Sequence, residues 1–258
     1  MESIAVISDI HGNLEALTAV LADIEDRGIR RIVCLGDVVG YGPQPRECLD
    51  LISQRCQVTL MGNHDFATMY EPNNFNIGAE SACYWTRQVL EDEPDRDARD
   101  RRLTFLGALP MRHVLPARES PVGEVTLAHG SPRRPVNEYV FPDDIYNNPN
   151  KLHGLFDRFE NLCLIGHTHV PGVFLTTPDF YSPDELEDVY EVVGHKALIN
   201  VGSVGQPRDR DSRASYAILE EDQVRFARVP YDVETTVSKV HATSELDDYL
   251  GNRLREGR

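Results

Sequence analysis

Five short segments of the chain carry the residue types that bind divalent metal ions. Each follows an apolar run typical of a strand, and each combines Gly with Asp, Asn or His. In open α/β sheets ligands bind at the carboxyl ends of the strands, so segments that are far apart in the sequence can meet there. We expect one shared site, built from SDIHG (8–12), LGDVVG (35–40), MGNHD (61–65), AHG (128–130) and IGHTH (165–169).

The potential ligand atoms in these segments suit transition metals. Asp9 and His11 are two residues apart, as are His167 and His169, so each pair points to one side of an extended backbone. Imidazoles, carboxylates and one amide, without thiolates, favour Mn, Fe, Zn, Co or Ni over a cysteine-based structural zinc site. One tetrahedral ion cannot use so many ligands, whereas two divalent ions that share a bridging carboxylate can. The candidate metal ligands are Asp9, His11, Asp37, Asn63, His129, His167 and His169.

Each segment alone also has an ordinary structural explanation. A D-x-H pair occurs often by chance, the histidine of AHG can be a core or surface residue, and a G-D pair is common in turns. The occurrence of all five segments at strand ends favours a functional site over five independent turns.

The same segments resemble the calcineurin-like metallophosphoesterases, whose motifs are D-x-H, G-D, G-N-H-D/E, a histidine at a strand end, and G-H-x-H. The resemblance runs from residue 5 to about residue 209, and the strings GDVVGYGPQP and INVGSVGQPRD are similar to compact bacterial and archaeal members. It implies an α/β two-sheet sandwich flanked by helices, an αββα four-layer fold, with a small cap insertion. It also implies a first metal ion held by Asp9, His11 and His169, a second held by Asn63, His129 and His167, and a bridging Asp37.

The resemblance further implies hydrolysis of a phosphomonoester or phosphodiester by attack of a metal-bridging hydroxide. His64 would stabilise the transition state and protonate the leaving oxygen, and Asp65 would orient the His64 imidazole. The residues themselves suggest weaker candidates for substrate binding, namely Arg208 in GQPRD, Arg133 after AHG, and Tyr41, which could stack on a base. Each of these three is equally compatible with a plain structural role.

Two alternative functions stay open at this level. Within enzymes, the same site could serve a dinucleoside polyphosphate hydrolase. In a different class, a metal-binding scaffold for protein interactions could keep the fold without turnover, although the presence of His64 and of every metal ligand disfavours it. A dinucleotide-binding fold is excluded because Gly36, Gly40 and Gly42 do not form a G-x-G-x-x-G motif.

The composition limits the partners that we expect. The chain of 258 residues has a formal net charge of −16, which disfavours long nucleic acids because their binding proteins carry basic faces. A small phosphorylated substrate is expected instead, with nucleotides among the candidates. No stretch is long and apolar enough to span a membrane, no secretory signal is recognisable, and the five cysteines are scattered, so we expect a cytoplasmic protein with reduced thiols.

Alternating apolar patterns predict the elements that position the site. The first 65 residues read as strand, helix, strand, helix, strand, which predicts a parallel sheet. Its strands are expected at 3–8, 31–35 and 57–61, with helices that begin after Asn13 and at Pro45. The second half predicts a sheet of short strands and hairpins at 124–128, 161–165, 173–176, 188–193, 197–201, 215–220 and 223–230.

Two segments lie outside this pattern. Residues 66–110 predict a cap-like insertion, with one helix at 79–90 and a solvated charge run at 91–102. Residues 1–232 are then expected to form the metallophosphoesterase domain, and residues 233–258 a helical tail. In that tail, the spacing of three leucines predicts one amphipathic helix that docks on the domain through Leu246, Leu250 and Leu254.

Overall fold

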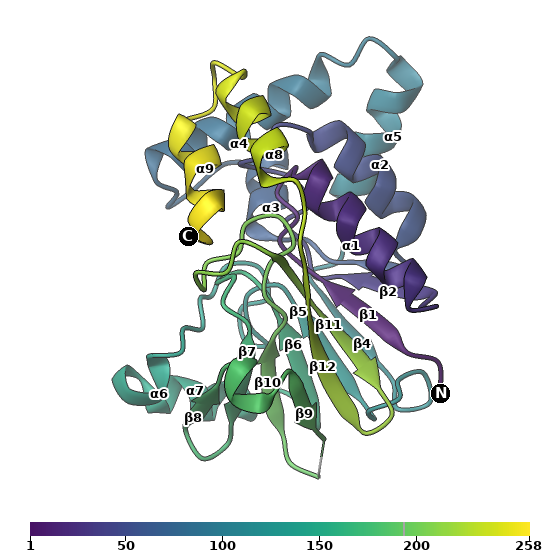
Figure 1. The fold of residues 1–258 in the computed structure, drawn as a ribbon, viewed down its shortest axis with the longest axis vertical. Helices are drawn as coiled ribbons and strands as arrows, with labels where there is room; N and C mark the ends of the chain where they lie inside the picture. The colour runs from purple at the N-terminus through teal and green to yellow at the C-terminus, as the bar shows by residue number, and fades with distance from the viewer. Residues whose placement is uncertain (193) are drawn as a thin grey trace.

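Two β-sheets form the centre of the protein, as Figure 1 shows for the computed structural model, which describes residues 1–192 and 194–258. The first sheet contains β1 (Ile4–Ile7), β2 (Arg31–Cys34), β3 (Val58–Thr59), β9 (Val189–Glu191), β11 (Ala214–Glu220) and β12 (Gln223–Val229). The second contains β4 (Arg112–Leu115), β5 (Val125–Ala128), β6 (Leu162–Ile165), β7 (Gly172–Leu175), β8 (Asp179–Tyr181) and β10 (Ala197–Asn200). Among the described residues each sheet has six strands, in the orders β3-β2-β1-β11-β12-β9 and β4-β5-β6-β10-β7-β8.

Strand β1 shows how both faces of the first sheet are covered. It pairs in parallel with β2 and antiparallel with β11. Ile4 and Val6 pack in the core between the two sheets, whereas Ala5 and Ile7 pack in the core beneath the helices. All four side chains are fully buried, because a strand covered on both faces needs apolar residues at every position. The predicted parallel order of β1, β2 and β3 is confirmed.

Helices cover the outer faces of both sheets. On the first sheet lie α1 (Leu14–Asp26) and α2 (Pro45–Arg55), as Figure 1 shows. On the second sheet the apolar side of α7 (Pro149–Phe156) packs against β6, β7 and β10, and the short α6 (Asp144–Asn147) precedes it. The order of layers is therefore helix, sheet, sheet, helix, which confirms the predicted α/β sandwich.

The segment between β3 and β4 is mostly helical. It begins with α3 (Asn63–Met69), a helix that was not expected from the sequence, and continues through α4 (Ile77–Glu91) and α5 (Arg96–Gly107). The first of these helices places Asn63, His64 and Asp65 in its first turn.

The charge run at 91–102 is more structured than predicted. Asp95 caps α5 by accepting hydrogen bonds from the N–H groups of Asp97 and Ala98. Arg102 of that helix is only 13% exposed and pairs with Asp50 on α2 at 2.6 Å. Mixed charges at helical spacing thus form caps and ion pairs here, as well as a solvated surface.

The C-terminal segment folds as α8 (Val233–His241), α9 (Asp248–Asn252) and a 3₁₀ turn, η2 (Arg253–Glu256). The expected single helix is interrupted because Asp247 caps a new helix by accepting from the N–H of Tyr249. The three leucines are nevertheless buried as the pattern predicts, since Leu246 and Leu250 pack in one cluster with Tyr41, and Leu254 is also buried.

Several short elements were not predicted from the sequence. They are β4, β8, α3, α5, α6, α7 and the 3₁₀ turn η1 (Asp184–Leu186). Of the strand expected at 188–193, the structure shows β9, while Val193 lies outside the described residues. Among the described helices, none combines the length and the apolar character needed to cross a membrane.

Candidate metal centre

The predicted metal ligands meet at one edge of the two sheets. Each lies in a loop or helix start directly after β1, β2, β3, β5 or β6, as expected for carboxyl ends of strands. All of them are buried, with side chains exposed by 8% or less. The structure brings together Asp9, His11, Asp37, Asn63, His129, His167 and His169.

The backbone at this edge adopts an unusual conformation. The φ angles lie between 50° and 66° at Asp9, His11, Asp37, His167 and His169, none of which is glycine. Left-handed conformations cost a non-glycine residue on the order of 1 kcal/mol or more, and they cluster at functional sites where the surrounding structure enforces them. The loops are therefore shaped to point these side chains inward, at some cost in stability.

Asp9, His11 and His169 form a first group, whose ligand atoms lie within 4.8 Å of one another. The outer ring nitrogens face backbone carbonyls, with Nδ1 of His11 at 3.3 Å from Val39 O and Nδ1 of His169 at 2.5 Å from Gln206 O. If both Nδ1 atoms donate, the two Nε2 atoms present lone pairs to each other across 3.2 Å. Two acceptors cannot form a hydrogen bond with each other, whereas a cation between them could bind both lone pairs.

A second group contains Asp37, His129 and His167, again with ligand atoms within 4.8 Å. Nε2 of His129 lies 3.3 Å from Oδ2 of Asp37 and 3.1 Å from Oδ1 of Asn63. The same Oδ2 atom of Asp37 lies 3.6 Å from Nε2 of His11 in the first group. Asp37 therefore stands between the two groups, where one carboxylate can serve both.

Unsatisfied buried atoms support metal binding at these groups. Among the described residues, Oδ1 of Asp9 and Nε2 of His167 are buried and make no hydrogen bond. Buried polar atoms without partners are rare because each costs about 1–3 kcal/mol. Oxygen and imidazole donors of this kind fit divalent transition metals, so the residues present suit the ions that the sequence predicts.

The charges at the centre are strongly coupled. Burial disfavours the charged form of His129, but the carboxylates of Asp37 and Asp9 outweigh it and raise the pKa of this imidazole to about 9. By contrast, burial holds the pKa of His11 and of His167 well below the ordinary value. A proton on His129 therefore balances part of the carboxylate charge in the metal-free protein.

His64 is held in the first turn of α3. Its backbone N–H donates to Oδ1 of Asp37 at 2.8 Å, and its ring packs against Tyr41 and Phe75 with centroid distances of 4.3 and 4.8 Å. Burial lowers the pKa of the imidazole to about 4, so the ring is neutral at pH 7. Gly40 permits this packing, because a Cβ there would lie 2.4 Å from Nδ1 of His64.

Asp65 has a different contact from the predicted one. Its carboxylate accepts hydrogen bonds at 2.7–3.2 Å from the backbone N–H groups of Asp37, Val38, Val39 and Gly62. It therefore fixes the loop after β2 against the start of α3, and the expected hydrogen bond to the His64 imidazole is not among these contacts. Asp65 follows His64 on the same turn of α3, but its side chain faces the backbone of the loop after β2.

The residue that does contact the His64 ring nitrogen is Cys83 on α4, with Sγ 3.5 Å from Nδ1. Cys83 is a free, buried thiol, as the scattered cysteines predict, but its contact with His64 was not predicted. No local motif surrounds Cys83, and only the packing of α4 on α3 brings it to the site.

The weaker substrate-binding candidates fall into two classes. Tyr41 is 9% exposed and packs against the rings of both His11 and His64, and the Arg208 guanidinium lies 5.9 Å from the centre of the Tyr41 ring. Arg133 is instead exposed and paired with Glu138, whose Oε2 accepts from Nε at 3.2 Å. The expectation that Arg133 binds substrate is therefore not supported by its contacts.

Comparisons with known proteins agree with this geometry. Residues 2–224 match the calcineurin-like phosphoesterase superfamily domain. The chain is 38% identical over 264 residues to the uncharacterised protein MJ0912 of Methanocaldococcus jannaschii, covering 99% of this chain and 98% of that protein.

Solved structures are similar along the whole chain. A metallophosphoesterase from Sphaerobacter thermophilus is 36% identical, with a TM-score of 0.82 over 100% of this chain and 99% of that one. The hypothetical protein PH1004 from Pyrococcus horikoshii OT3 shares the fold, with 20% identity and a TM-score of 0.76 over 100% and 99% of the two chains. The chain therefore belongs to the calcineurin-like phosphoesterase superfamily.

Proposed function

We propose that this protein is a binuclear-metal-dependent phosphoesterase that hydrolyses a phosphomonoester or a phosphodiester. The observation that carries this proposal is the position of Asp37, whose Oδ2 atom faces His129 at 3.3 Å and His11 at 3.6 Å. A carboxylate shared by two groups of ligands is the arrangement that two neighbouring ions need.

The two ions would be held by residues that the structure already brings together. Asp9, His11 and His169 would hold one, and Asn63, His129 and His167 the other, with Asp37 shared. Ions of the Mn, Fe, Co, Ni or Zn type would supply positive charge to the phosphoryl oxygens and would lower the pKa of the attacking water. The protein has a net charge of −16, so such local positive charge is needed for an anionic substrate.

His64 would stabilise charge on the leaving oxygen as the ester P–O bond breaks and a new P–O bond to water forms. Because burial lowers its pKa to about 4, His64 would act as a neutral hydrogen-bond donor, which differs from its expected role as a proton donor, and the leaving oxygen would take its proton from solvent water. Burial raises the pKa of the Cys83 thiol to about 12, so this thiol keeps its proton and can donate it to Nδ1 of His64. The imidazole then carries its own proton on Nε2, directed at the centre.

Arg208, whose guanidinium lies over the Tyr41 ring, would bind the phosphoryl group. Its Nη2 donates to Oε1 of Gln206 at 2.8 Å, which fixes the guanidinium beside the metal centre. Its Nε is buried and has no hydrogen-bond partner among the described residues. A phosphate oxygen is a suitable acceptor, because guanidinium groups bind phosphate in a planar, bidentate manner.

The proposal is tested by turnover. Purified protein with Mn²⁺ would be assayed on p-nitrophenyl phosphate and bis(p-nitrophenyl) phosphate, beside Asp37→Asn and the matched control Asp26→Asn, which changes an exposed carboxylate on α1. We expect metal-dependent hydrolysis that falls by about 100-fold or more in Asp37→Asn only. If folded native protein is as inactive as Asp37→Asn with each of the five metals, the enzyme proposal fails and a scaffold role is favoured.

A further inference from the structure

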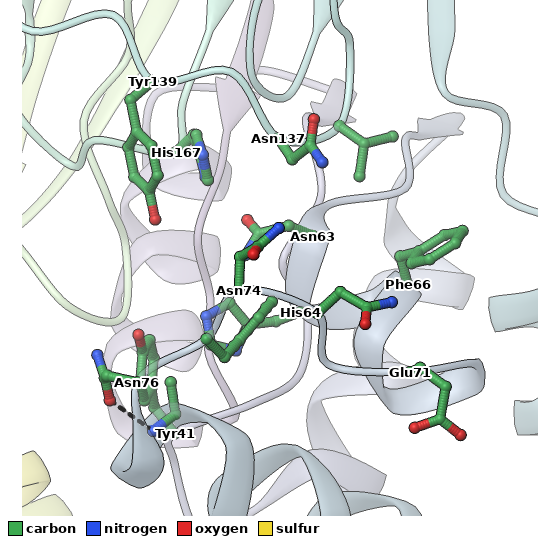
Figure 2. A pocket seen from close by; sticks show the side chains of 14 residues that line it. Tyr41, Asn63, His64, Phe66, Glu71, Asn74, Asn76, Asn137, Tyr139 and His167 are labelled. Carbon is green, nitrogen blue, oxygen red and sulfur yellow. Dashed lines mark hydrogen bonds between the residues drawn. The ribbon is translucent and has the colours of Figure 1, made fainter.

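A cavity of about 290 Å³ opens directly beside the metal centre. Its inner end is formed by Asn63, His64 and His167, which belong to the site itself. Its walls come from two loops, one before α4 and one after β5, at 71–76 and 136–139. Figure 2 shows these side chains around the opening, with Tyr139 beside His167. A substrate whose phosphate lies at the metal centre would place its remaining part here.

The charges of the lining residues indicate which part of a substrate this cavity can hold. None of the described lining residues is Lys or Arg, and the lining contains one carboxylate, Glu71, which accepts a hydrogen bond from the Tyr84 hydroxyl at 3.2 Å. Further phosphate groups would therefore find no cation in the cavity and would be repelled by Glu71. The cavity suits an uncharged group attached to a single phosphate.

Asparagines supply most of its hydrogen-bonding groups. Asn76 is occupied, because its Oδ1 caps α4 by accepting from Ala79 N at 2.9 Å. The side-chain amides of Asn73, Asn74 and Asn137 make no hydrogen bond to other described residues. Each amide offers both a donor and an acceptor, which is the pattern required to read the edge of a nucleobase.

Aromatic rings give the same cavity flat apolar walls. Tyr139 stacks on His167 with a centroid distance of 3.9 Å and an interplanar angle of 22°, lies parallel to Phe141 at 5.3 Å and remains 45% exposed. Phe75 meets His64 edge-on at 4.8 Å and 71°, on the other loop. Aromatic side chains together with amide groups are typical of sites that hold a base.

We propose that the cavity binds the nucleoside part of a nucleotide that carries one phosphate group, and this inference rests on the proposed phosphoesterase function. The volume lies at the lower end of the roughly 300–1,000 Å³ typical of small-molecule sites, so it accommodates one nucleoside and not two. The second nucleoside of a dinucleoside polyphosphate would lie outside, and its additional phosphates would lack cations.

Binding of nucleosides tests the cavity without requiring turnover. Adenosine, uridine and ribose would be added to native protein at millimolar concentration, and contact would be followed by saturation-transfer NMR. The double variant Asn74→Ala/Asn137→Ala and the matched control Asn147→Ala, at an exposed asparagine of α6, would be measured alongside. We expect transfer to the base protons of the nucleosides, little transfer to ribose, and loss of at least about 10-fold in nucleoside affinity in the double variant only.

Turnover separates this inference from the proposed function. With Mn²⁺, kcat/KM for adenosine or uridine 5′-monophosphate should exceed that for ribose 5-phosphate by about 50-fold or more, and the double variant should reduce this ratio. Hydrolysis of ribose 5-phosphate at the same rate as the nucleotides, with no nucleoside contact, would overturn the inference and leave the phosphoesterase standing. Nucleoside contact without hydrolysis of any ester would support the cavity assignment and overturn the proposed function.

Discussion

The backbone N–H of His64 donates to Oδ1 of Asp37 at 2.8 Å, while Oδ2 of the same carboxylate faces the imidazoles of His11 and His129. One carboxylate thus joins the start of α3 to both groups of metal ligands. The position of His64 relative to the centre is therefore coupled to the position of Asp37. Gly62 makes this approach possible, because a Cβ there would lie 2.0 Å from Oδ1 of Asp37.

Replacement of Asp65 should unfold the loop that carries Asp37. The carboxylate of Asp65 satisfies four buried N–H groups, so Asp65→Ala should lower the free energy of unfolding by about 3 kcal/mol or more. The control is Asp95→Ala, which removes two cap hydrogen bonds at the exposed start of α5 and should cost about 1 kcal/mol. Urea unfolding measures both, and equal losses would argue against a structural role for Asp65 in this loop.

Cys83 should act as a positioning residue for His64. Loss of the thiol in Cys83→Ala frees Nδ1 of His64, and we expect kcat to fall about 10-fold with little change in KM. Cys83→Ser retains a donor and should restore most of kcat. Cys48→Ala, at a buried cysteine on α2 away from the site, serves as the control for a small cavity. Identical kinetics for the Ala and Ser variants of Cys83 would contradict a hydrogen-bonding role.

Arg208 and Arg133 should differ sharply although both are arginines near the site. Arg208→Ala should reduce kcat/KM by about 100-fold, because its guanidinium has no carboxylate partner among the described residues and lies beside Tyr41. Arg133→Ala should stay within about twofold of native, since the Arg133 charge is already paired with Glu138 at an exposed position. Steady-state kinetics on the chromogenic phosphomonoester measures both variants. A larger loss of kcat/KM in Arg133→Ala than in Arg208→Ala would refute the assignment of Arg208 to the phosphoryl group.

Metal binding should release protons and strengthen as the pH rises. The pKa of His129 is raised to about 9 by Asp37 and Asp9 against the effect of burial, so this imidazole is protonated below that pH in the metal-free protein. An ion that takes the imidazole must displace the proton, so affinity should rise by up to about tenfold per pH unit between pH 6 and 9 and level off above it. Calorimetric titration of Mn²⁺ in buffers of different ionisation enthalpy measures the proton count. An affinity that does not depend on pH over this range would rule out displacement.

The strand ends of this site could be predicted because each is marked locally. Short apolar runs followed by Gly with Asp or His define β1, β2, β5 and β6 and the ligands after them. The start of α3 at Asn63 could not be predicted, because its N-cap is Gly62, which has no side chain to signal a cap. The left-handed backbone at residues such as Asp9 could not be predicted either, because this conformation is uncommon even for Asp and His and the neighbouring loops enforce it here.

The contacts that come from packing were also beyond the sequence. Cys83 reaches His64 only because α4 lies on α3, and only the fold brings the loops at 71–76 and 136–139 together as walls of one cavity. The tail leucines were predicted to be buried on one helix, but Leu246 lies before α9, Leu250 in α9 and Leu254 in η2, because α9 begins only after the Asp247 cap. Residues whose roles arise from contacts between distant segments thus need the structure.

The number of metal ions per chain tests the central claim most directly. Metal-free native protein, Asp37→Asn and Asp26→Asn would be dialysed to equilibrium against Mn²⁺, and the bound metal counted by elemental mass spectrometry. We expect two ions per chain in the native protein and in Asp26→Asn, and no more than one in Asp37→Asn, because that variant loses the shared carboxylate. A native protein that binds one ion or none with every candidate metal would contradict a binuclear centre.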